Sequence, residues 1–165
     1  MRDLARISTG IFLAVVMYTF LEKISFSTIL IFNIFNLVVL YFAREKGETS
    51  GALLGLFCGM IQDSFSGGVF GVAGISKTIS GFLAGVTAKR VDVVLFRRSF
   101  MFIFIFSGLE LIIWAILYTL IFSERINTGG GVIFFQPLGT ALLGSLIFLL
   151  IRILSRLKYK RRHEE

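Results

Sequence analysis

The sequence predicts an all-α integral membrane protein with six transmembrane helices and both termini in the cytoplasm. Three observations lead to this prediction: the composition, the spacing of the apolar segments and the distribution of the basic residues. Of the 165 residues, 56% are hydrophobic, and the mean hydropathy is +0.87. Soluble domains usually contain about 45–50% apolar residues. The composition is therefore typical of a membrane protein.

Six apolar segments approach the length of about 20 residues that a helix needs to cross a bilayer. They cover residues 7–21, 26–43, 50–65, 69–88, 99–122 and 131–154. The second and fifth segments are the clearest, whereas the third is short and rich in glycine. Because the connections are short, residues 1–165 form a single transmembrane domain, which ends in a basic cytoplasmic tail, residues 155–165.

The basic residues set the orientation, because cytoplasmic loops of membrane proteins are enriched in Lys and Arg. With the N-terminus inside, only Lys23 and Arg125 fall in outer loops, and Lys77 falls within a segment. The fourteen on the inner side are Arg2, Arg6, Arg44, Lys46, Lys89, Arg90, Arg97, Arg98, Arg152, Arg156, Lys158, Lys160, Arg161 and Arg162. This asymmetry favours six spans with both termini in the cytoplasm. It also explains the net charge of +7, so nucleic acid is not needed as a partner. The basic tail could attract anionic membrane lipid.

Glycines recur at four-residue spacing in the third and fourth segments. Small residues at this spacing let two membrane helices approach closely. We therefore expect residues 50–65 and 69–88 to form an antiparallel hairpin in which the two glycine faces meet; a passage for a ligand is the alternative. The glycines concerned are Gly51, Gly55, Gly59, Gly71, Gly74, Gly81 and Gly85.

Three charged residues, Asp63, Lys77 and Glu110, lie within or at the end of apolar segments. Counted from the outer ends of their segments, Lys77 is roughly 12 Å and Glu110 roughly 18 Å deep, while Asp63 is close to the outer end of its own. A charge near the middle of a bilayer costs at least about 2.5–3.5 kcal/mol, so such residues usually pair inside the bundle. The sequence predicts a structural polar core in which Lys77 pairs with either Asp63 or Glu110.

Asn33 and Asn36 form a polar edge on the second segment, and Trp114 follows Glu110 on one face of the fifth. These side chains could line an internal cavity or contact a partner helix. Polar residues that join helices to one another are more common than ligand-binding residues in membranes.

The residues that catalysis would need are missing from the apolar segments. Cys58 is the only cysteine, and His163, the only histidine, lies in the charged tail. Asp92 follows basic residues at the cytoplasmic surface, on the opposite side of the membrane from Asp63. An intramembrane protease needs a Ser–His pair, two facing Asp residues or a His–Glu metal site. We therefore expect no enzymatic activity, no metal site and no cofactor.

The stretch GALLGLFCGMIQDSFSGGVFGVAGISKTISGFLAG, residues 51–85, resembles the rod shape-determining protein MreD family of bacteria. The resemblance is carried by Asp63, Lys77 and the glycines at their spacings, and the length, six-span plan and basic tail agree with it. One departure is MIQD, where the family more often has a second Leu.

The resemblance implies a non-enzymatic membrane scaffold of the cell-elongation complex in the bacterial inner membrane. In that complex MreD is associated with MreC, the actin-like MreB, RodA and a class B penicillin-binding protein, which together maintain rod shape through peptidoglycan synthesis. The family is similar in fold to the substrate-binding subunits of energy-coupling-factor transporters. The alternative is therefore a transporter subunit that binds a small molecule in a cavity lined by Asn33, Asn36, Glu110 and Trp114. The AxxxA pattern expected for docking such a subunit is missing from residues 7–21.

Overall fold

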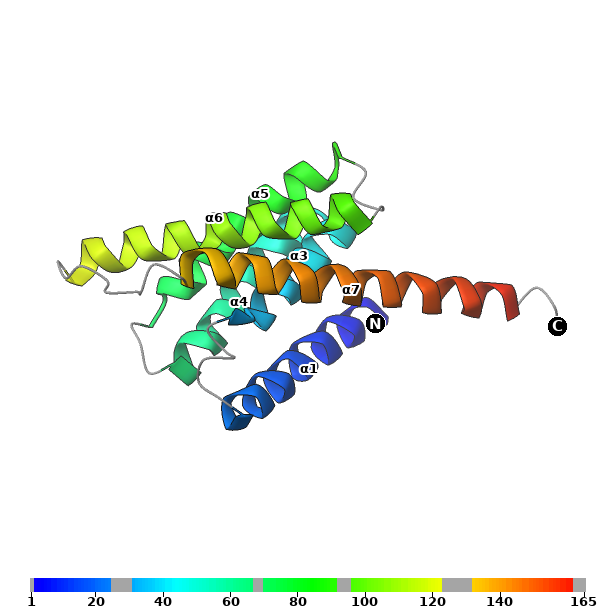
Figure 1. Ribbon diagram of the computed structural model, residues 1–165, viewed down its shortest axis with the longest axis horizontal. Helices are drawn as coiled ribbons and strands as arrows, with labels where there is room; N and C mark the ends of the chain where they lie inside the picture. Colours follow the sequence, from blue (N-terminus) through cyan, green and yellow to red (C-terminus); the bar gives the residue numbers. More distant parts are fainter. Residues whose placement is uncertain (1, 25–30, 67–69, 92–95, 123–131, 162–165) are drawn as a thin grey trace.

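The computed structural model describes residues 2–24, 31–66, 70–91, 96–122 and 132–161, and this part of the chain is all-α. Its helices are α1 (Arg2–Ile24), α3 (Ile34–Lys46), α4 (Glu48–Ser66), α5 (Val72–Ala88), α6 (Phe96–Phe122) and α7 (Val132–Arg161). Successive helices run in alternating directions along the long axis of the molecule (Figure 1). As a result, the beginning of α1 and the end of α7 lie towards the same end.

Three of these helices are long and apolar enough to cross a membrane: Asp3–Lys23 within α1, Phe96–Ile121 within α6 and Phe134–Leu154 within α7. Helix α5 is also apolar but shorter, with 17 residues. Large apolar side chains such as Phe12 and Leu120 are exposed on the outside of the bundle. These features are those of a membrane protein, in which such faces contact lipid.

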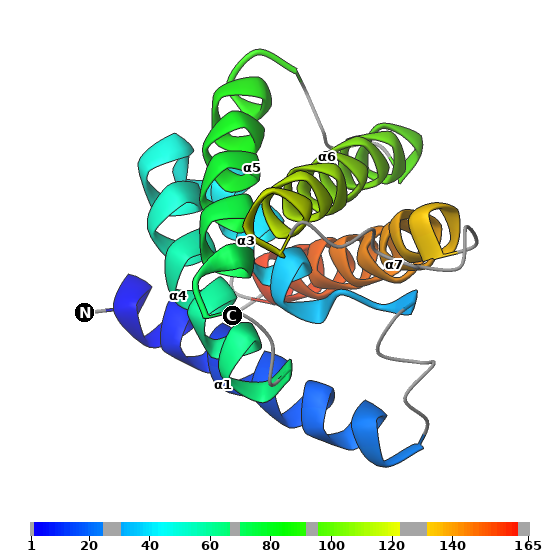
Figure 2. The same cartoon turned by 90° about the vertical axis from the view of Figure 1, so that its left-hand side faces the viewer.

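Helix α3 is the centre of the bundle and contacts every other helix in the described part of the chain; Figure 2 shows the others arranged around it. Apolar side chains pack on two sides of it. Leu40 belongs to a cluster with α5, α6 and α7, which includes Ile103 and Phe148. Phe35 belongs to a second cluster with α1 and α4, which includes Tyr18. A short central helix thus holds two halves of the core together.

The prediction of one continuous helix over residues 26–43 is wrong. Helix α3 begins only at Ile34 and continues to Lys46, and Phe32 and Asn33 are not helical; residues 25–30 lie outside the described part. The cause is Asn33, whose side-chain Oδ1 caps α3 by accepting a hydrogen bond from the Asn36 backbone N–H at 3.1 Å. Irregular backbone at membrane depth is tolerated where protein surrounds it, and Asn33 is buried.

The other boundaries shift less. Helix α7 continues to Arg161, so the first part of the predicted tail is helical rather than a separate segment. Helix α1 begins at Arg2, and α5 begins at Val72 rather than at residue 69. Hydropathy marks where a segment becomes apolar, whereas the backbone hydrogen bonds of a helix continue into polar sequence beyond it.

Helices α4 and α5 form the most extensive helix pair of the described residues. At the end of this pair where α4 begins and α5 ends, Lys89 donates a hydrogen bond from Nζ to Glu48 Oε1 at 2.7 Å. This contact with the Lys89 ammonium lowers the pKa of the Glu48 carboxyl below its usual value. A group with a lowered pKa stabilises the fold above its unfolded pKa, and the contribution is lost as the pH falls through the folded pKa. Because Lys89 is exposed to solvent and Glu48 is only partly buried, the contribution is small.

Candidate functional site: a buried polar network at α3, α5, α6 and α7

The centre of the candidate site is an ion pair between Lys77 on α5 and Glu110 on α6. Lys77 Nζ lies 2.6 Å from Glu110 Oε1, and the two side chains are 0% and 4% exposed. Ser76 Oγ is 3.4 Å from the same carboxylate oxygen. Of the two pairings that the sequence left open, the structure therefore contains Lys77–Glu110.

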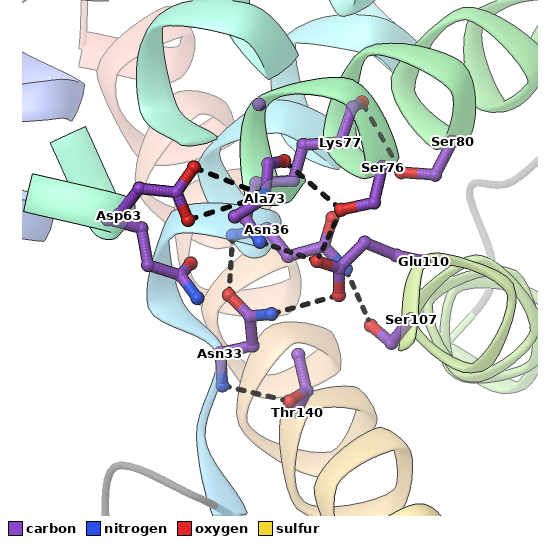
Figure 3. A network of polar contacts seen from close by, with 12 residues as sticks. Asn33, Asn36, Asp63, Ala73, Ser76, Lys77, Ser80, Ser107, Glu110 and Thr140 are labelled. Carbon is purple, nitrogen blue, oxygen red and sulfur yellow. Dashed lines mark hydrogen bonds and ion pairs between the residues drawn. The ribbon is translucent and has the colours of Figure 1, made fainter. Parts of the chain in front are cut away.

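Two asparagines extend this pair to the other helices (Figure 3). Asn33 donates from Nδ2 to Glu110 Oε2 at 3.0 Å, and its backbone N–H donates to Thr140 Oγ1 on α7 at 3.1 Å. Asn36 donates from Nδ2 to Ser107 Oγ on α6, also at 3.1 Å. The carboxylate of Glu110 thus accepts hydrogen bonds at both oxygens, and polar contacts join α3, α5, α6 and α7.

This closed arrangement determines what the polar network can do. Taking two charges out of water costs several kcal/mol per ion, which only close pairing and further hydrogen bonds offset. The pair is close, and the Glu110 carboxylate accepts further hydrogen bonds from Asn33 and Ser76. Three cavities among the described residues are lined by other side chains, and Lys77, Glu110 and Asn33 line none of them. In this geometry the two charges bind one another and join α5 to α6. We refer to the Lys77–Glu110 pair as the latch.

Asp63 does not pair with Lys77, so this alternative of the sequence-based prediction is wrong. Its carboxylate accepts hydrogen bonds from the backbone N–H groups of Gly71 at 2.7 Å and Ala73 at 3.2 Å, at the start of α5. Gly71 is the N-cap residue and has no side chain with which to cap the helix. A carboxylate at this position satisfies free N–H groups and interacts favourably with the helix dipole. Asp63 therefore joins the last part of α4 to the start of α5.

We expect Asp63→Ala to lower the free energy of unfolding by about 1–2 kcal/mol, since the first turn of α5 loses its cap. Asp63→Asn should cost less, because an amide oxygen still accepts one hydrogen bond. The matched control is Ser64→Ala, whose hydroxyl donates a hydrogen bond to Met60 O of its own helix. The measurement is unfolding by SDS in mixed micelles. Equal effects of D63A and S64A would contradict the capping role.

The glycine faces of α4 and α5 meet, as the four-residue spacing predicted. A Cβ on Gly55 would overlap the Lys77 carbonyl, and one on Gly59 would overlap the Gly74 backbone. The same holds for Gly51 against Gly81 and for Gly85 against Glu48. The two backbones are in direct contact along the hairpin, so any side chain at these glycines would force the helices apart.

Two glycines of the predicted packing face have other roles. A Cβ on Gly74 would make ordinary contacts, the nearest being Met60 Cγ at 3.6 Å; here only the backbone takes part in the close packing. Gly71 has a φ of +102°, with nothing within 4 Å of a Cβ. This left-handed conformation is why glycine is needed there. Four-residue spacing alone does not separate packing glycines from conformational ones.

Trp114 lies apart from the polar network. It is partly buried on α6 and stacks on Tyr118, with ring centroids 5.3 Å apart. Conversely, the sequence-based prediction did not include Ser76 or Thr140, although both are fully buried in the network. Their signal in the sequence was weak, because Ser and Thr are common in membrane helices and satisfy their own hydroxyls on the preceding turn.

The comparisons with known proteins add nothing to this geometry: no family model, curated protein or solved structure matches the chain.

Proposed function

We propose that this protein is a non-enzymatic, multi-pass scaffold of the cell-elongation complex in the bacterial inner membrane. In this proposal six segments cross the membrane, with both termini in the cytoplasm, and the chain helps to maintain rod shape by organising peptidoglycan synthesis. The partners implied by the resemblance to MreD are MreC, RodA, the class B penicillin-binding protein and MreB.

The observation that carries the proposal is that the buried charged side chains bind to other helices of the same bundle. Asp63 caps α5, and Lys77 and Glu110 pair with one another. A carrier or an enzyme would need at least one such group to face a substrate. A scaffold needs only a rigid shape, which the latch and the glycine hairpin supply.

The surfaces available to partners are apolar helix faces. On α1, Phe12, Val16 and Phe20 are exposed, and on α7 Phe134 and Phe135 are exposed. Membrane helices associate through packing of such faces in lipid. We propose that these faces contact the single transmembrane helices of MreC or of the penicillin-binding protein.

The transporter-subunit alternative requires a ligand cavity lined by Asn33, Asn36, Glu110 and Trp114. Asn33 and Asn36 instead bond to Glu110 and Ser107, and Trp114 is stacked on Tyr118. The packing of these side chains favours the scaffold over the alternative.

Depletion of the protein from its own rod-shaped cells tests the proposal. We expect the cells to become round, and we expect K77E/E110K to restore rods in the depleted cells where K77E does not. Cell width and length measured by phase-contrast microscopy give the result. Rods that persist after complete depletion would overturn the proposal.

A further inference from the structure

Helix α1 is the least buried of the three long apolar helices and lies at the edge of the bundle (Figures 1 and 2). Only 11% of its apolar stretch is buried, against 28% in α6 and 39% in α7. Among the described helices, only α3 packs extensively against it. A cavity of about 510 Å³ lies between α1 and α7 and is lined by apolar side chains such as Leu13 and Ile147. Helix α1 is therefore supported mainly along the side that faces α3.

Apolar packing anchors the second half of α1. Ala14 and Tyr18 are four residues apart and so lie on the same side of the helix. Both are buried, with 2% and 7% of their surfaces exposed. The Tyr18 ring centre lies 5.4 Å from that of Phe35 on α3 and 5.5 Å from that of Phe65 on α4. This part of α1 is thus fixed to two other helices.

Ion pairs attach the beginning of α1 to the last turn of α3. Asp3 Oδ2 lies 2.7 Å from Lys46 Nζ, and Arg6 Nη1 lies 2.9 Å from Glu45 Oε1. The side chains of Asp3 and Arg6 are 64% and 56% exposed. Exposed ion pairs contribute little to stability and are weakened by salt. The beginning of α1 is therefore its weakly held end.

We propose that α1 is a lever that turns about Tyr18, and that the Asp3–Lys46 and Arg6–Glu45 pairs hold it in the closed position of this structure. When both pairs break, the beginning of α1 moves away from α7. The cavity then widens at the end that is lined by Ala5 and Ile151. The proposal rests only on the contacts of α1 and does not depend on a role in cell elongation.

Distances between spin labels, measured by double electron–electron resonance in phosphatidylcholine nanodiscs, test this proposal. Cys58 is the only cysteine, so in a C58A background labels attach only to introduced cysteines. Labels at Leu4 and Leu150 report the separation of α1 and α7 at the end where α1 begins. Labels at Phe20 and Phe134 report the opposite end, and all four side chains are exposed.

Breaking the ion pairs should lengthen the first distance and leave the second unchanged. Raising the salt concentration from about 0.01 M to about 1 M shortens the Debye length from about 30 Å to about 3 Å, which weakens exposed pairs. The Leu4–Leu150 distribution should then shift towards longer distances. At low salt, D3N/R6Q removes both pairs and should raise the ratio of the open to the closed population roughly two- to thirtyfold.

The matched control is E48Q, which breaks the Glu48–Lys89 ion pair between α4 and α5. It should leave both distances as they are in the wild type. The salt dependence of the wild-type chain decides the matter if D3N/R6Q folds poorly. A Leu4–Leu150 distribution that stays unchanged under either treatment would overturn the proposal. Equal lengthening of both distances would also overturn it, since α1 would then detach as a whole instead of turning about Tyr18.

Discussion

Replacing Lys77 with Met should lower the free energy of unfolding by about 3–5 kcal/mol, a large effect for a single substitution. The Glu110 carboxylate would remain buried with its cationic partner removed, and an uncompensated buried charge is costly. Lys77 and Glu110 are 0% and 4% exposed, so water cannot take the place of the lost ammonium. The measurement is the SDS unfolding midpoint and slope in mixed micelles.

The pairing itself is tested by charge exchange. We expect K77E/E110K to recover most of the stability that K77E loses, whereas K77E/D63K should be no better than K77E alone. We also expect K77M/E110M, which replaces both charges with apolar groups of similar length, to be much closer to the wild type than either single variant. Additive effects of the two Met substitutions would show that Lys77 and Glu110 do not interact.

The second large effect is expected at Gly55. A methyl group there would overlap the Lys77 carbonyl and contact the Thr78 backbone nitrogen, and a backbone cannot move away as a side chain can. Overpacking of this kind costs about 1–3 kcal/mol, occasionally more. Because the displaced residue is Lys77, Gly55→Ala should also disturb the Lys77–Glu110 pair. Its cost should therefore be smaller in a K77M/E110M background than in the wild type.

Gly74→Ala is the matched control for Gly55→Ala. It lies on the facing helix at the same hairpin interface, yet a Cβ there meets nothing nearer than 3.6 Å. Since alanine favours a helix over glycine by up to about 1 kcal/mol, G74A should be neutral or slightly stabilising. If G55A and G74A have the same effect, the close contact of the two helix backbones does not govern stability.

The sequence predicted the features that depend on local pattern. Four-residue glycine spacing indicated the contact of α4 with α5, because helical geometry places residues i and i+4 on one face. The cost of burying a charge indicated that Lys77 has a carboxylate partner. All six segments contain helices in the described part of the chain, and the basic residues gave an orientation that stays a prediction.

The features that the sequence could not settle depend on how distant segments meet. By residue spacing alone, both Asp63 and Glu110 lie within reach of the long Lys77 side chain. Only the rotation of α5 relative to α6 decides which of them is the partner. The break at Asn33 is similar. Its side chain caps α3 while also bonding to Glu110, 77 residues further along the chain. A hydropathy profile cannot detect a helix that begins inside an apolar run.

The most direct test of the scaffold account is recovery of partners from native membranes. The protein, carrying an affinity tag and expressed at its natural level, is solubilised in mild detergent and purified, and co-purifying proteins are identified by mass spectrometry. The account predicts that MreC is enriched with the wild type and with K77E/E110K, and is lost with K77E. Enrichment of a pair of transporter ATPases without MreC would contradict it.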